Sequence, residues 1–158
     1  IVNEKIRQNV PVVINEMKKD EASEGLATYQ AIGKRDIYQL IQAIRNGLSF
    51  QIFQSMAKNI PFSISEWASY LHLSERTMQR YKTEKLSFDP IQADKIFQIS
   101  ILYKNGIEIF GSELKFNTWL ATENIALGNV KPKSLLDSTF GIKLLNDTLG
   151  RIEHGIFA

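Results

Sequence analysis

The most constraining feature of the sequence is a helical spacing of apolar residues that begins near residue 36. Apolar side chains recur there at i, +3, +4, +7 and +11, which places them on one helix face: Ile37, Leu40, Ile41, Ile44 and Leu48. No stretch of the chain alternates apolar and polar residues as a half-buried strand does. These patterns predict an all-α fold of roughly eight to ten short helices around a shared core.

Residues that start and stop helices predict where these elements end. Gly47 is expected to close the first helix in a left-handed cap, and helix starts are predicted at Ser49, Ser65, Ser74, Asp89 and Thr139. The helix that opens at Asp89-Pro90 is expected to reach about Tyr103. Gly106 and Gly111 are then expected to bracket a further short turn of helix. The helix 90–103 is apolar on two sides, which fits either a dimer interface or burial within one protomer.

Composition narrows the classes of partner. The chain has 158 residues, of which 44% are apolar, so it can bury a core for one domain or for two small ones. It has no cysteine, which excludes disulfides and cysteine-ligated metals and fits a cytoplasmic protein. No apolar run approaches the roughly 18 residues of a membrane helix, so no membrane partner is expected. Because the net charge is only +2, a nucleic-acid partner has to be argued from a local patch.

Residues 66–81 have the pattern of a helix-turn-helix. Ala68 supplies a small side chain where two helices cross, and Leu73 supplies an apolar residue in the turn. Met78 and Tyr81 lie three apart, which gives the second helix an apolar back. The segment resembles the Xre-type helix-turn-helix, except that His72 stands where the turn usually holds glycine. A histidine can adopt the left-handed backbone that this position requires, at some energetic cost.

The front of the second helix carries the candidate DNA contacts. Arginine pairs with guanine and glutamine with adenine in the major groove, while lysine suits phosphates. The predicted DNA-binding residues are Ser74, Glu75, Arg76, Thr77, Gln79, Arg80, Lys82 and Lys85. Residues 74–85 hold four positive charges against two negative ones, so an ordinary solvated face is the competing interpretation. Because one such module reads a single half-site, a DNA reader of this type is expected to be a dimer or a higher oligomer.

The C-terminal third has a different character. Five positive charges stand against six negative ones over residues 106–158, so this part is not a nucleic-acid footprint. Its notable phrases are Phe110-Gly111, Trp119-Leu120, Asn124 to Gly128, Lys131 to Asp137, Gly141 and Gly150 to Ala158. In this order and spacing they resemble the toxin-binding domain of Xre/MbcA/ParS antitoxins. The expected organisation is an arm over 1–35, a helix-turn-helix domain over 36–105 and a toxin-binding domain over 106–158.

The resemblance implies a function for the whole chain. It implies the antitoxin of a type II toxin–antitoxin pair, which binds a NAD-consuming RES-domain toxin directly and represses its own operon through operator DNA. It further implies a cytoplasmic binding protein without a cofactor. Two alternatives stay open: a stand-alone helix-turn-helix regulator whose C-terminal domain only dimerises, and a small all-α enzyme. The last has little support, since the only histidines are His72 and His154, in different predicted units.

The end of the chain is the predicted toxin contact. Gly155 is placed to release an apolar tip from the last helix, and an aromatic side chain such as Phe157 is a typical interface anchor. In the resembled family this region lies against the toxin. The predicted toxin-binding residues are therefore Arg151, Glu153, His154, Ile156 and Phe157. The alternative is that Phe157 folds back onto its own core.

Overall fold

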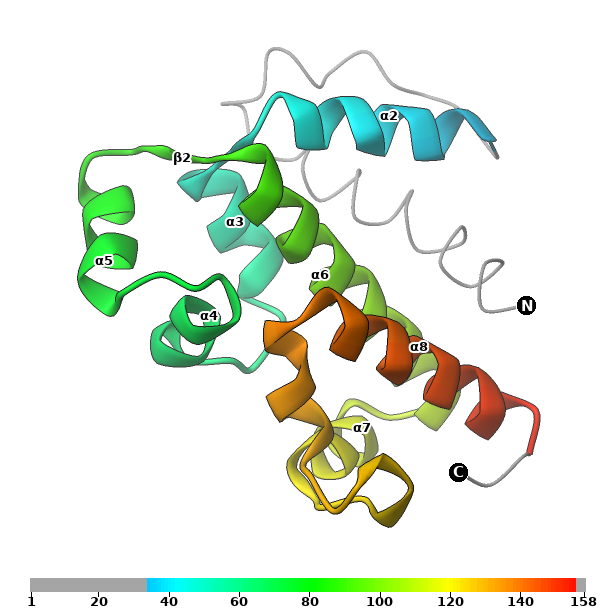
Figure 1. The fold of residues 1–158 in the computed structure, drawn as a ribbon. Coiled ribbons are helices and arrows are strands. Elements are labelled where there is room, and N and C mark those ends of the chain that lie inside the picture. The colour runs from blue at the N-terminus through cyan, green and yellow to red at the C-terminus, as the bar shows by residue number, and fades with distance from the viewer. Residues whose placement is uncertain (1–33, 156–158) are drawn as a thin grey trace.

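The computed structural model describes residues 34–155 and confirms the all-α fold. The long helix α6 (Pro90–Phe110) runs through the molecule, with α2 (Lys34–Arg45) and α8 (Thr139–Glu153) packed against it (Figure 1). The other helices are α3 (Phe50–Ala57), α4 (Ile64–Tyr70), α5 (Glu75–Thr83), α7 (Glu113–Ala121) and the 3₁₀ helices η1 (Ile125–Leu127) and η2 (Pro132–Asp137). The predicted arm lies almost wholly outside the described residues, as do Ile156 and Phe157.

A short antiparallel ladder joins the start of α3 to the segment after α5. Strand β1 (Leu48–Ser49) pairs with β2 (Ser87–Phe88), so that Leu48 lies opposite Phe88. Leu48 was expected on the first helix, but Gly47 ends that helix with a left-handed φ of 79°. A Cβ at Gly47 would lie 2.7 Å from the Phe88 carbonyl oxygen, so the turn requires glycine for two reasons.

Helix α6 extends past its predicted end at Tyr103 and stops at Gly111, whose φ is 68°. Gly106 therefore lies inside the helix and does not open a new turn. A Cβ there would stand 2.1 Å from the Phe116 ring, so the missing side chain makes room for α7. The residues on both sides of α6 are buried within one protomer, among them Ile96, Ile99 and Leu102. Burial inside the monomer, not a dimer interface, thus accounts for the two apolar sides of α6.

The predicted caps at Ser49, Ser74 and Asp89 are confirmed, and two others are shifted. Helix α4 is capped by Ser63, not Ser65, because Ser63 stands three residues before Glu66. The Glu66 N–H donates to the Ser63 hydroxyl at 3.0 Å, and the Ser63 N–H donates back to the Glu66 carboxylate at 2.9 Å. Helix α8 is capped by Ser138, not Thr139.

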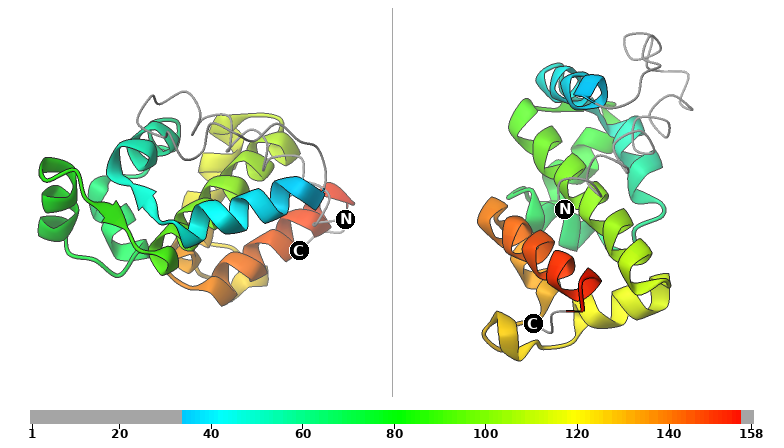
Figure 2. Two further views of the ribbon diagram at one scale, coloured as in Figure 1. Left: turned by 90° about the horizontal axis from the view of Figure 1, so that it is seen from above. Right: turned by 90° about the vertical axis from the view of Figure 1, so that its right-hand side faces the viewer.

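The C-terminal helix sits directly on η2. Four apolar side chains are buried where η2, α6 and α8 meet: Leu136, Ile142, Leu145 and Leu149. A Cβ at Gly141 would lie 2.0 Å from the Leu135 carbonyl oxygen, so the backbones of α8 and η2 touch only because position 141 is glycine. Figures 1 and 2 show the consequence for the shape: α5 lies at one end of the molecule and the last turn of α8 at the other.

Candidate DNA-binding and partner-binding surfaces

Helix α5 is held on the core by its back. Met78 is buried, and the Tyr81 ring packs 5.2 Å from the ring of Phe88 on β2. In the preceding turn the Leu73 N–H donates to the Ala68 carbonyl at 2.9 Å, and the Leu73 side chain packs against the core. The contacts predicted for a helix-turn-helix are therefore confirmed, and they leave the opposite side of α5 in solvent.

The exposed front of α5 brings three predicted base-contacting residues together. Arg76, Gln79 and Arg80 are all exposed and lie at i, +3 and +4, so they share one face of the helix. Glu75 is exposed beside them in the first turn. Guanidinium and amide groups in this arrangement can read guanine and adenine edges in a major groove.

Ser74 and Thr77 shape the start of α5. The Thr77 N–H donates to the Ser74 hydroxyl at 3.0 Å, and the two hydroxyl oxygens lie 2.8 Å apart. The Ser74 hydroxyl thus satisfies one free amide of the first turn and also bonds to the Thr77 hydroxyl, which accounts for both residue types at these positions. Their contact with DNA stays a prediction.

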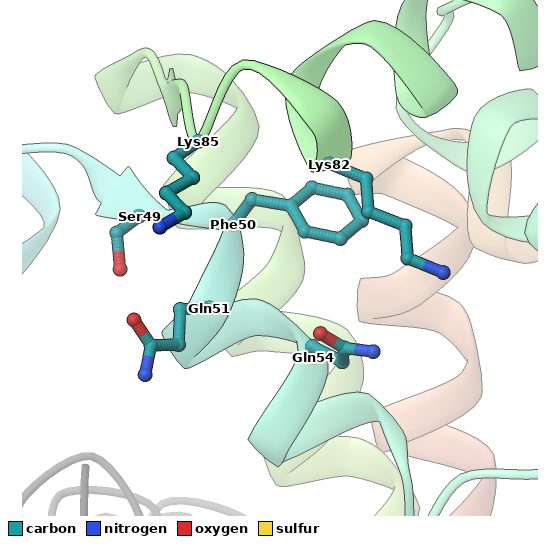
Figure 3. Close-up of a pocket in the computed structure, with 6 residues that line it drawn as sticks. All are labelled: Ser49, Phe50, Gln51, Gln54, Lys82 and Lys85. Carbon is teal, nitrogen blue, oxygen red and sulfur yellow. The ribbon is translucent and has the colours of Figure 1, made fainter.

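Lys82 and Lys85 lie apart from the arginines, on a groove between α5 and α3 (Figure 3). The groove has a volume of about 510 Å³ and is lined by Ser49, Phe50, Gln51, Gln54, Lys82 and Lys85. Lys85 adopts a left-handed φ of 53°, which turns the chain into β2. The pairing of β2 with β1 then brings Lys85 beside the first turn of α3.

The groove adds residues that the sequence alone did not single out. Gln51 and Gln54 are exposed on α3 and line the same hollow as the two lysines. An adjoining hollow of about 240 Å³ continues along α3 and includes Lys58 and Lys82. Together these side chains form a polar, cationic margin next to α5. Their only sequence signal is an i, i+3 pair of glutamines, which points to DNA only once α3 is known to lie beside Lys85.

His72 has a second role that its sequence position did not reveal. Its φ of 56° confirms the left-handed turn. Its ring Nε2 lies 2.8 Å from the Asp137 carbonyl oxygen, which can only accept, so the histidine donates. The Lys95 ammonium donates to the same carbonyl at 2.5 Å. The helix-turn-helix is thereby fastened to the end of η2, 65 residues further along the chain.

A salt bridge makes a second link between α4 and η2. The Lys133 ammonium lies 2.6 Å from a Glu66 carboxylate oxygen. Burial by itself would raise the pKa of Glu66, but the hydrogen bonds from Lys133 and from the Ser63 N–H outweigh it and lower that pKa. Burial lowers the pKa of Lys95, against the attraction of Asp137. These polar contacts connect the helix-turn-helix to the C-terminal part in one protomer.

The predicted toxin-contact residues that the structure describes lie at the end of α8. Arg151, Glu153 and His154 are exposed there, and Gly155 ends the helix with a φ of 69°. Arg151 and Glu153 are two residues apart and so point to different sides of the helix. Ile156 and Phe157 lie outside the described residues, and their contacts remain predictions.

Comparison with known proteins agrees with this two-part arrangement. Residues 39–99 match the antitoxin Xre-like helix-turn-helix domain, and residues 105–155 match the antitoxin Xre/MbcA/ParS C-terminal toxin-binding domain. The chain is also 27% identical over 120 residues to antitoxin Xre of Yersinia enterocolitica, covering 75% of this chain and 81% of that protein. The chain belongs to the Xre/MbcA/ParS antitoxin family.

The two family regions of this antitoxin-family chain meet on α6. The helix-turn-helix match ends at residue 99 and the toxin-binding match begins at residue 105, both within Pro90–Phe110. The described part of the chain holds no cluster of three or more metal-binding side chains. Among residues 34–155, no helix is both long enough and apolar enough to cross a membrane.

Proposed function

We propose that this protein is the antitoxin of a type II toxin–antitoxin pair and neutralises a NAD-consuming RES-domain toxin by direct binding. The observation that carries the proposal is the combination of an exposed Arg–Gln face on α5 with a C-terminal region that matches a toxin-binding domain. Through the same helix-turn-helix the protein represses its own operon. It acts in the bacterial cytoplasm by binding alone, without catalysis and without a cofactor.

The DNA-binding part of the proposal assigns different tasks to the cations at that end. Arg76, Gln79 and Arg80 contact base edges, because they project together from the front of α5. Lys82 and Lys85 contact phosphates, because they line the groove beside that front. Two protomers bind a palindromic operator, since one module reads only one half-site.

The toxin-binding part of the proposal rests on the opposite end of the molecule. Arg151, Glu153, His154, Ile156 and Phe157 contact the toxin and obstruct access to its active site. Because α5 and the end of α8 lie at opposite ends (Figure 2), one protomer can hold DNA and toxin at the same time. This arrangement suits an antitoxin that represses its operon while it is bound to its partner.

The test is co-expression with the product of the adjacent gene, followed by affinity capture through a tag on the antitoxin. The expected result is a stable complex that also shifts promoter DNA, together with protection of cells from the active toxin. Removal of Gly155 to Ala158 is expected to abolish protection and leave DNA binding intact. A protein that shifts promoter DNA but captures no toxin would instead be a stand-alone regulator.

A further inference from the structure

Helix α8 and its cap residue His154 carry a stripe of side chains, exposed except for the half-buried Asp147, that extends well beyond the residues assigned to the toxin above. Residues at positions 140, 143, 144, 147, 151 and 154 lie within about 60° of one line along the helix, at 100° per residue. We call this set the α8 stripe: Phe140, Lys143, Leu144, Asp147, Arg151 and His154. It runs for about 21 Å, at 1.5 Å per residue. Glu153 points to the other side of α8 and does not belong to it.

The stripe contains Phe140, the single aromatic residue of α8, and its ring is largely exposed to solvent. Phe140 is 83% exposed and Leu144, one turn further on, is 41% exposed. The packing of α8 on its own protomer uses the opposite face, with Ile142, Leu145 and Leu149. Phe140 is therefore not needed to hold α8 in place, and two adjacent apolar side chains in water are characteristic of an interaction surface.

The polar members of the stripe make it suitable for a protein partner. Lys143 and Asp147 form a salt bridge of 3.1 Å along the helix, which cancels their charges. Arg151 then leaves one net positive charge on the whole stripe. A surface that binds nucleic acid would concentrate several cations, as the α5 end does. An apolar anchor flanked by neutralised charges and an arginine is the composition of a protein–protein interface.

We propose that the α8 stripe is the surface on which the toxin docks, with Phe140 inserted into an apolar pocket of the toxin. The inference rests on the proposed function and extends the proposed contact along α8 by about three helical turns, from Arg151 to Phe140. The toxin is the chosen occupant because α8 lies in the region 105–155 that matches a toxin-binding domain. The stripe is also continuous with Arg151 and His154, which belong to the toxin contact predicted from sequence.

The test compares two double variants in toxin capture. Phe140→Ala/Leu144→Ala removes the apolar part of the stripe. Leu114→Ala/Ile125→Ala is the matched control, because these residues are 76% and 86% exposed on α7 and η1, within the same family region but off α8. The probe is the catalytically inactive product of the adjacent gene, titrated against each purified variant. The stripe variant is expected to bind at least tenfold more weakly, and the control within about twofold of wild type, in line with hot-spot behaviour.

Two further measurements keep the outcomes distinct. Thermal melts and promoter binding are expected to be unchanged for both variants, and Phe140→Ala alone provides a milder variant at an 83% exposed site. Equal toxin binding by wild type and Phe140→Ala/Leu144→Ala would overturn the docking inference but leave the proposed function standing. Failure of the wild type to bind toxin would overturn the proposed function itself. Conversion of a dimer to a monomer with toxin capture retained would reassign the stripe to self-association.

Discussion

Helices α5 and α8 are built on the same plan but expose opposite chemistry. Each is anchored by an apolar back and leaves a front in solvent. The front of α5 holds Arg76, Gln79 and Arg80, without a large apolar side chain. The front of α8 is led by Phe140 and Leu144, and its charges largely cancel.

This difference shows how one small chain can serve two unlike partners. A polyanion is attracted by cations that remain hydrated and mobile, so α5 needs no apolar anchor. A folded protein is bound chiefly through a few buried side chains, so α8 needs few charges. In the proposed arrangement, the distance between the two fronts keeps the cationic surface away from the toxin and the apolar surface away from DNA.

The largest expected effect is a loss of promoter binding when two arginines are removed from the front of α5. Arg76→Ala/Arg80→Ala is expected to weaken promoter binding by about 1–3 kcal/mol for each base-contacting arginine, because each loses a bidentate contact. The variant should capture toxin as wild type does. Electrophoretic mobility shifts at fixed salt measure the loss. The control, Lys115→Ala/Lys131→Ala, removes two exposed positive charges from the other region, off α8. DNA binding unchanged in the arginine variant would remove α5 from the interface.

The next effect acts on the support of α8. Gly141→Ala is expected to destabilise the fold by about 2–3 kcal/mol, because the new methyl group collides with a backbone carbonyl in a packed core. That carbonyl, of Leu135, would lie 2.0 Å from the added Cβ. Chemical denaturation measures the change. Gly111→Ala is the control, since open space surrounds that position and only its left-handed φ is strained. A melt identical to wild type would mean that α8 does not need this close approach.

A smaller effect concerns the groove beside α5. Lys85→Gly is expected to stabilise the protein by about 0.5–1 kcal/mol, because glycine adopts a positive φ without strain. The same change should reduce the salt dependence of DNA binding by about one phosphate contact and affect all sequences alike. Lys82→Ala serves as the comparison, with the loss of salt dependence but no gain in stability. A salt dependence equal to that of wild type in both variants would exclude the groove from DNA contact.

The smallest effect tests the link between the two regions. Because the pKa of Glu66 is lowered in the folded state, its carboxylate stabilises the fold above the unfolded value of about 4.5. That contribution disappears as the pH falls through the lowered pKa. Glu66→Gln is expected to cost less than about 1 kcal/mol at pH 7, as is usual for partly exposed ion pairs, and nothing at strongly acid pH. Urea unfolding at both values measures it. An equal difference at both pH values would contradict the assignment.

The sequence predicts what depends on neighbouring residues and misses what depends on distant ones. The caps at Ser74 and Asp89 were predictable because each bonds to an amide three residues on. Ser63 was also predictable, since Ser63-x-x-Glu66 is a capping box, whereas Ser65 lies next to Glu66 and cannot form one with it. The end of α6 was missed because Gly106 resembles a stop signal when the Phe116 ring that packs against it is unknown.

The candidate site divides in the same way. The front of α5 follows from helical spacing alone, so Arg76, Gln79 and Arg80 were identified from sequence. The groove residues Gln51 and Gln54 were missed because β1 and β2, nearly 40 residues apart in the chain, bring α3 to Lys85. The bond from His72 to Asp137 spans 65 residues and has no local signal.

Helix α6 continues without a break through both family regions, and this limits how chimeras between relatives can be joined. Because α6 is one continuous helix, the number of residues in it sets the angle between the proposed DNA-binding front of α5 and the proposed toxin-binding front of α8. A single residue inserted near Lys104 would rotate one front against the other by about 100° and shift it by about 1.5 Å. Chimeras that graft a new C-terminal region onto this helix-turn-helix must therefore join within α6 at matching register, or carry the whole helix with them.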